Sequence, residues 1–195
     1  MKKFPLLYLM LSMIYSVISF AAEKNVIFFI TDDQSPTLGC YGDPVAQTPA
    51  VDSLAADGTL FTHAFATTAS CSASRSVVMS GLHNHANGQY GHQHAFHKFS
   101  SYYNVISLSL PRAMAEAGYR TGHIGKYHVA PEEVFHFETY LRGSGRNAVQ
   151  MAERSREFIT EKSDKPFFLY FATSDPHRGG GKDKNSQRTL KPDLF

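Results

Sequence analysis

Two consecutive carboxylates, Asp32 and Asp33, follow an apolar run at residues 26–30. Neighbouring side chains in a β-strand point to opposite faces, so the two aspartates converge only where the chain leaves the strand. Two carboxylates at close range repel each other unless a cation neutralises them, and hard oxygen ligands suit Ca²⁺ or Mg²⁺. The pair therefore predicts a divalent-metal site. The alternative is a solvated turn, because Asp-Asp-Gln-Ser-Pro is also good turn chemistry.

Other polar residues with chemical capacity also follow apolar runs. Lys126 and His128 come after one predicted strand, and Asp175 and His177 come after another. In open parallel sheets, sites form beyond the carboxyl ends of the strands. Lys126 offers a positive charge to an anion, whereas the two histidines offer proton transfer. We therefore predict that they share one site with the aspartates. The alternative for each is an ordinary surface residue or a hydrogen-bonded loop histidine.

A sheet with flanking helices must position these residues. Strands are predicted from apolar runs rich in β-formers at residues 26–30, 119–124 and 167–172, the first buried on both faces, with a short strand-like stretch at 60–66. One helix is predicted from Thr48, as its N-cap, to Gly58, with Val51, Leu54 and Ala55 on one face. A second is predicted from a cap at Ser72 or Ser74 to Gly81. Two more are predicted over residues 110–117, ending before Gly118, and over residues 148–159. This alternation predicts an α/β fold with a mostly parallel sheet flanked by helices. The tail, residues 178–191, is predicted to be irregular.

The segment Cys71-Ser72-Ala73-Ser74-Arg75 resembles the cysteine motif of the sulfatase family, whose core is Cys-x-(Pro or Ala)-x-Arg. The aspartate pair and the segments at 48–55, 80–82, 125–128 and 175–178 follow in family order, and the resemblance covers everything after about residue 24. Residues 81–91, 125–132 and 167–178 resemble the sulfamidase subgroup. The resemblance implies the N-terminal domain of an alkaline-phosphatase-like fold. It also implies hydrolysis of a sulfuric ester or sulfamate on a sulfated sugar of the N-sulfoglucosamine type.

The resemblance further implies that Cys71 is oxidised to formylglycine, whose hydrate is a geminal diol. One hydroxyl attacks sulfur to form a covalent sulfo-enzyme, and the other helps to expel sulfate. Asp32, Asp33 and the modified Cys71 would hold a divalent metal, Ca²⁺ or Mg²⁺, and Arg75 would hold the modified side chain. A formylglycine-generating maturation enzyme is an expected partner. Ala73, which replaces the commoner proline, leaves the maturation route open, since Ala-type motifs in the family are associated with radical-based maturation more than with the oxygen-dependent enzyme. Without the motif, Cys71 would be interpreted as a small buried hydrophobe.

The same resemblance assigns roles around a sulfated saccharide substrate. Lys126 would contact a sulfate oxygen, His128 would bridge nucleophile and substrate, and His177 would protonate the leaving nitrogen or oxygen. His85, His97 and Arg178 are candidates for substrate binding. One loop carries the histidines 83, 85, 92, 94 and 97, which we interpret as a substrate-pocket loop. A polar loop without function and a zinc site are the alternatives, although no cysteine or carboxylate accompanies these histidines at a finger-like spacing.

The N-terminus has the pattern of a secretory signal peptide over residues 1–21. Lys2 and Lys3 form a basic start, residues 6–20 are apolar, and Ser19 and Ala21 supply small residues for cleavage. We expect export, to a bacterial periplasm or the exterior. A membrane anchor is the alternative, although the apolar run is short for a spanning helix. The motif also favours a free Cys40 over a Cys40–Cys71 disulfide, which is the one intrachain pairing that two cysteines allow.

Length and charge limit the remaining function classes. The 195 residues carry a formal net charge of +2 with no block of like charge, which argues against a nucleic-acid partner. The sequence has no later Asp-Asn pair, which completes the metal site in the family, so we interpret residues 22–195 as the N-terminal part of a sulfatase catalytic domain. The alternatives are an O-sulfatase acting on another glycan or an aryl sulfate, an inactive truncated product, and a phosphoryl hydrolase of the same superfamily.

Overall fold

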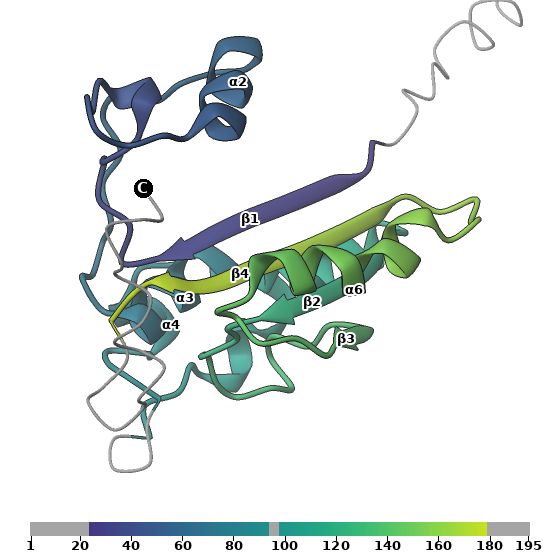
Figure 1. The fold of residues 1–195 in the computed structure, drawn as a ribbon. Helices are drawn as coiled ribbons and strands as arrows, with labels where there is room; N and C mark the ends of the chain where they lie inside the picture. The colour runs from purple at the N-terminus through teal and green to yellow at the C-terminus, as the bar shows by residue number, and fades with distance from the viewer. Residues whose placement is uncertain (1–23, 94–97, 179–195) are drawn as a thin grey trace, which may run out of the picture.

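The computed structural model describes residues 24–93 and 98–178. Its elements in chain order are β1 (Val26–Asp32), η1 (Gly39–Tyr41), α2 (Pro49–Asp57), α3 (Cys71–Ser80), α4 (Asn84–Asn87), η2 (Tyr103–Leu108), α5 (Leu110–Glu116), β2 (Arg120–Gly125), β3 (Thr139–Leu141), α6 (Ala148–Thr160) and β4 (Phe167–Pro176). The four strands form one sheet in the order β1-β4-β2-β3, and every neighbouring pair is parallel (Figure 1). The predicted α/β class with a parallel sheet is confirmed.

The central strand β4 divides the core into two layers. Phe168, Tyr170 and Ala172 pack with Met79 of α3 on one face of the sheet. The alternate residues of β4 face α6 on the other side, where Phe167, Leu169 and Phe171 pack with Met151 and Phe158 (Figure 1). Both sets are apolar because a parallel strand covered on both faces needs no polar alternation. This burial makes β4 a rigid support for the residues at its carboxyl end.

The predicted burial of β1 on both faces is wrong for the described part of the chain. Ile27 and Phe29 remain 53% and 57% exposed, although Phe29 stacks on Phe171 with ring centroids 5.0 Å apart. The physical reason is position: β1 is an edge strand of this sheet, and α6 lies over β2 and β4 rather than over β1 (Figure 1). The opposite face of β1, with Phe28 and Ile30, packs against the core cluster around Tyr170.

The helix at residues 49–57 forms as predicted, with Thr48 as N-cap and Pro49 in the first turn. Its predicted apolar face is not buried, because α2 lies away from the sheet (Figure 1), and Val51 and Leu54 are 42% and 73% exposed. Asp52 instead ties the helix to η1 by accepting a hydrogen bond from the Cys40 amide at 2.7 Å.

Other boundaries also differ from those predicted. The helix after the cysteine motif begins at Cys71 with Ser70, in an extended conformation, as its N-cap, not at Ser72 or Ser74. Residues 60–66 form no strand, since an apolar run becomes a strand only where a neighbouring strand pairs with it. Strand β4 continues to Pro176, so Asp175 lies within it. The three-residue strand β3 has too little apolar character to be recognised before its pairing with β2 is known.

Several predictions concern residues outside the described ranges. The signal peptide at residues 1–21, the histidines 94 and 97, and the tail beyond residue 178 belong to this group. Within the described residues, no helix combines the length and the apolar character needed to cross a membrane.

Candidate active site

The carboxyl ends of β1, β2 and β4 meet the N-terminus of α3, as the positions of the polar residues predicted. A cleft of about 470 Å³ opens there. It is lined by the end of β1, by residues of the following turn and by the start of α3, namely residues 30–35, 66, 68–71, 74 and 75. Asp32, Asp33, Cys71 and Arg75 are all part of this lining, so one cavity brings together four of the predicted site residues.

Asp32 lies buried between two cations. Its Oδ1 accepts a hydrogen bond from Arg75 Nη2 at 3.3 Å, and its Oδ2 accepts one from the Lys126 ammonium. Burial raises the pKa of Asp32, but the hydrogen bond from Lys126 and the charges of Lys126 and Arg75 outweigh it, so the net shift of this pKa is downward. Asp32 therefore stays ionised and joins the ends of β1 and β2 to helix α3.

Arg75 is buried and donates three hydrogen bonds within this network. Besides Asp32, its guanidinium donates to the Lys126 carbonyl and to the Tyr170 hydroxyl, both at 3.2 Å. The three contacts use the fixed fork of the guanidinium to connect α3 with three strands. This arrangement directs the Arg75 charge toward Asp32. Its predicted role of holding a modified Cys71 stays a prediction.

Asp33 faces the cleft. It has a φ of 55°, which turns its side chain away from that of Asp32. Its Oδ1 lies 3.8 Å from Cys71 Sγ, and its Oδ2 lies 3.6 Å from His177 Nε2. The two carboxylates were predicted to converge where the chain leaves β1. In the structure their surroundings differ: Asp32 is buried in an ion-pair network, whereas Asp33 contacts Cys71 and His177.

Cys71 is the first residue of α3 and is half-buried beside the two aspartates. Burial raises the pKa of its thiol; the Lys126 ammonium opposes this rise, and the carboxylates of Asp32 and Asp33 add to it. The thiol is therefore protonated at neutral pH and is a weak nucleophile as it stands. Cys40 and Cys71 are both free, which confirms the prediction that no disulfide joins them.

The backbone at the end of β2, which brings Lys126 and His128 to the site, has unusual φ angles. Gly125 closes β2 at a φ of 90°, and a Cβ there would lie 2.0 Å from the Ala172 carbonyl oxygen. Asp33 and His128 are the non-glycine residues with positive φ within the described ranges. Such conformations are costly and cluster at functional sites, and both residues flank Cys71.

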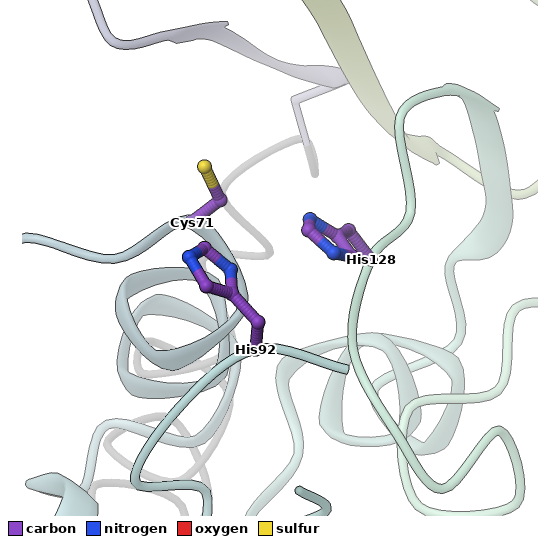
Figure 2. A group of neighbouring side chains, drawn as sticks. All are labelled: Cys71, His92 and His128. Atoms are coloured by element: carbon purple, nitrogen blue, oxygen red, sulfur yellow. The ribbon is translucent and has the colours of Figure 1, made fainter. Parts of the chain in front are cut away.

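His128 and His92 form a pair of parallel rings next to Cys71 (Figure 2). Their centroids lie 5.7 Å apart with an interplanar angle of 16°, and a ring nitrogen of each lies within 4.8 Å of the other and of Cys71 Sγ. The Ser70 hydroxyl lies 3.3 Å from His92 Nε2. The prediction of a site at His128 did not single out His92. Only its place in the histidine-rich loop could have drawn attention to it.

Arg146 is a second residue that sequence reasoning missed. Its Nη1 donates to Asp175 Oδ1 at 2.7 Å and to the His177 carbonyl at 2.9 Å. Nearby, the Ser174 amide donates to the Gly145 carbonyl at 2.7 Å. The segment before α6 thus holds the end of β4, from which His177 reaches Asp33. Within the sequence, no periodicity links Arg146 to His177, so only the tertiary contact reveals it.

Small polar residues on one face of α3 are covered by α4. The helix carries serines at every fourth position, 72, 76 and 80, and all are buried. The Asn87 amide donates to the Ser76 and Ser80 hydroxyls at 3.1 and 3.2 Å, and the Asn84 amide donates to the Ala73 carbonyl at 2.9 Å. The four-residue spacing of the serines was a signal that a polar partner, rather than the apolar core, would cover this face.

Two of the remaining predicted residues, His85 and Arg178, are exposed. His85, in α4, is exposed and stacks on His83 with centroids 5.8 Å apart. Arg178 is exposed directly after His177. His97 lies outside the described residues. Their roles in substrate binding stay predictions.

The chemistry of the cleft suits a hard divalent cation. Asp33 is 59% exposed beside Cys71, and Asp32, Cys71 and His177 offer ligand atoms within 4.8 Å of one another. Carboxylate oxygens are the ligands that such cations prefer. The donors fit, but two carboxylates are fewer than the six to eight oxygens that Ca²⁺ takes.

Known proteins resemble this chain in sequence. The family model described as Sulfatase matches residues 24–192. Human N-sulphoglucosamine sulphohydrolase is 41% identical over 167 residues, and an ulvan-active sulfatase of Formosa agariphila is 32% identical over 170 residues. The matches cover 82% and 85% of this chain and 33% of each relative. The chain thus spans about a third of the length of these relatives.

Solved structures support the fold. The structure of BT4656 in complex with its substrate D-glucosamine-2-N,6-O-disulfate matches with a TM-score of 0.63 at 24% identity, over 80% of this chain and 35% of that one. The structure of Ps i-CgsB matches with a TM-score of 0.53 at 22% identity, over 80% and 46%. At these identities the likeness concerns the fold alone. The match of the Sulfatase model over residues 24–192 shows that this chain belongs to the sulfatase family.

Proposed function

We propose that this chain carries the nucleophile-bearing part of a sulfohydrolase that releases sulfate from a sulfated sugar of the N-sulfoglucosamine type. The observation that carries the proposal is the convergence of Asp32, Asp33, Lys126 and His177 around Cys71, at the strand ends and the start of α3. The 41% identity to N-sulphoglucosamine sulphohydrolase supports the sulfamate substrate.

The proposed nucleophile derives from Cys71. Its thiol has a raised pKa because of burial, so the unmodified residue is poorly suited to attack a sulfate group that is itself anionic. Conversion to formylglycine by a maturation enzyme would supply a hydrated aldehyde in its place. The start of α3 suits this nucleophile, because the helix dipole favours negative charge there.

The metal-binding part of the site comprises Asp32, Asp33 and the modified Cys71. A bound Ca²⁺ or Mg²⁺ would act as a Lewis acid toward the sulfate oxygens. Asp32 already forms ion pairs with Arg75 and Lys126. Asp33 therefore supplies most of the negative charge that is available to the metal ion.

The other residues bind the anion and transfer protons. Lys126 offers its ammonium to a sulfate oxygen at the end of β2, and His128 borders the nucleophile on the side of His92. His177 protonates the leaving nitrogen or oxygen, since its Nε2 lies 3.6 Å from Oδ2 of Asp33, which lines the cleft. His85, His97 and Arg178 contact the sugar. Residues 1–21 direct export, to the periplasm or exterior.

Parallel assays test this function. Sulfate or phosphate release would be measured from N-sulfoglucosamine, a nitrophenyl sulfate and a nitrophenyl phosphate, using protein extended through its downstream reading frame to the length of its relatives. We expect turnover of the sulfated substrates, loss of turnover in Cys71→Ala, and retention in the matched thiol control Cys40→Ser. Preferential phosphate release would support a phosphoryl hydrolase instead, and activity in Cys71→Ala would exclude the proposed nucleophile.

A further inference from the structure

We propose that the unmodified protein, with Cys71 still a thiol, binds a zinc ion through Cys71, His92 and His128. The three side chains come from the start of α3, from the loop after α4 and from the turn after β2, and they meet in one place (Figure 2). Their ligand atoms lie within 4.8 Å of one another, and all three residues are half-buried. This group shares Cys71 with the proposed hard-cation site, but its other ligands are two imidazoles instead of carboxylates.

The ligand types select zinc. A thiolate and two imidazoles are characteristic Zn²⁺ ligands, at about 2.3 Å for sulfur and about 2.0–2.1 Å for nitrogen. Ligand atoms in a tetrahedral site with these lengths lie about 3.5 Å apart. Small side-chain rotations would close the observed separation to that value. Three protein ligands leave a fourth position for solvent, as in open zinc sites.

The surroundings of the group favour a bound cation on balance. The Ser70 hydroxyl, 3.3 Å from His92 Nε2, is the kind of outer partner that orients a ligating imidazole. The Asp33 carboxylate, 3.8 Å from Cys71 Sγ, contributes negative charge. The Lys126 ammonium and the Arg75 guanidinium oppose a cation here, and they share the single negative charge of Asp32. The Asp33 carboxylate offsets the positive charge that remains.

The fold brings a cysteine next to the histidine-rich loop. The histidine-rich loop has no cysteine near it in the sequence, but α3 brings Cys71 against His92, 21 positions later in the chain. The same sulfur atom is the proposed point of oxidation. A zinc-bound thiolate and a formylglycine therefore exclude one another, and zinc would hold the protein in its unmodified state.

Cobalt titration tests the site directly. Co²⁺ replaces Zn²⁺ in such sites, and a thiolate bound to it produces a sulfur-to-metal charge-transfer absorption. Titrating the reduced 195-residue chain, produced without maturation, should give this absorption at one equivalent, and Zn²⁺ should abolish it. Absence of the band would overturn the proposal. Because the readout is not catalysis, it is independent of the proposed sulfohydrolase activity.

Variants assign the ligands. His92→Ala and His128→Ala should each weaken Co²⁺ binding by more than about tenfold, since loss of even an outer-shell partner costs about 10–100-fold. The controls His83→Ala and Cys40→Ser should bind as the unaltered chain does. Unchanged affinity in both ligand variants would overturn the proposal, with circular dichroism reporting whether each is folded.

Alkylation of the unaltered chain provides a measurement that needs no variant. Zn²⁺ should slow the reaction of Cys71 with iodoacetamide and leave that of Cys40 unchanged, as peptide mass spectrometry can resolve. Equal rates at Cys71 with and without Zn²⁺ would contradict a zinc–thiolate bond. Equal slowing at both cysteines would show nonspecific thiol binding, which also overturns the proposal.

Discussion

Arg146 Nη1 lies 2.7 Å from Asp175 Oδ1, and the same nitrogen lies 2.9 Å from the His177 carbonyl oxygen. One guanidinium nitrogen therefore holds the end of β4 from a segment that precedes α6. The proposed general acid, His177, follows this end directly, so the orientation of its imidazole depends on Arg146.

Replacing Arg146 should affect turnover more than stability. The ion pair is about one-third exposed on each side, so Arg146→Met should cost at most about 1 kcal/mol of unfolding free energy. Misplacement of His177 should lower kcat on the order of 10²-fold in the extended protein. Arg146→Lys should restore much of this, because both contacts come from one nitrogen that an ammonium can replace. A large loss of stability without rescue by lysine would indicate a merely structural role.

Cys71 should be formylglycine in protein from the native host. Mass spectrometry of the tryptic peptide that carries Cys71 should show the aldehyde or its hydrate, whereas Cys40 should stay a thiol in the same sample. Active protein with only a Cys71 thiol would rule out the proposed nucleophile.

The effect of replacing His177 on turnover should depend on the leaving group of the substrate. A sugar amine needs protonation to depart, whereas a nitrophenolate needs little. In the extended protein, His177→Ala should therefore depress turnover of N-sulfoglucosamine by ~10²–10⁴-fold and turnover of a nitrophenyl sulfate far less. Equal losses on both substrates would point to binding or structure instead.

The isolated 195-residue chain should bind Ca²⁺ weakly and turn over substrate feebly. Asp32 and Asp33 supply only part of the six to eight oxygens that Ca²⁺ takes, and both Asp32 oxygens already contact cations. Calorimetry should show little or no binding heat. Micromolar binding accompanied by full turnover would contradict this expectation.

His123 should make stability fall in mild acid. It lies buried on β2 among Tyr127, Phe137 and Tyr170, and burial lowers its pKa to about 4. The unfolded state, with a pKa of about 6.5, binds the proton first. Stability is therefore complete above about pH 6.5 and declines as pH falls toward 4, by about 3 kcal/mol in all.

Denaturant titrations at pH 7 and pH 4.5 measure this effect. His123→Phe should lose much less stability between the two pH values than the unaltered chain does. His136→Gln is a matched control, because it removes an imidazole from the surface and not from the core. An identical pH dependence in His123→Phe would show that other groups cause the decline.

The sequence alone was enough to predict the parallel α/β fold and the gathering of polar residues at the carboxyl ends of its strands. The apolar runs at 26–30, 119–124 and 167–172 determine strands because burying β-forming side chains stabilises them, and the carboxyl ends of parallel strands necessarily meet at one edge. The cysteine motif then led to the sulfatase family, which the match over residues 24–192 confirmed.

Only the tertiary structure decided how charges are shared within the site. Asp32 and Asp33 are adjacent in sequence, but the backbone reversal at Asp33 buries one between Arg75 and Lys126 and leaves the other facing Cys71. Arg146 and His92 came to the site through contacts between distant segments. No local pattern encodes such contacts, because they depend on how helices and loops pack against the finished sheet.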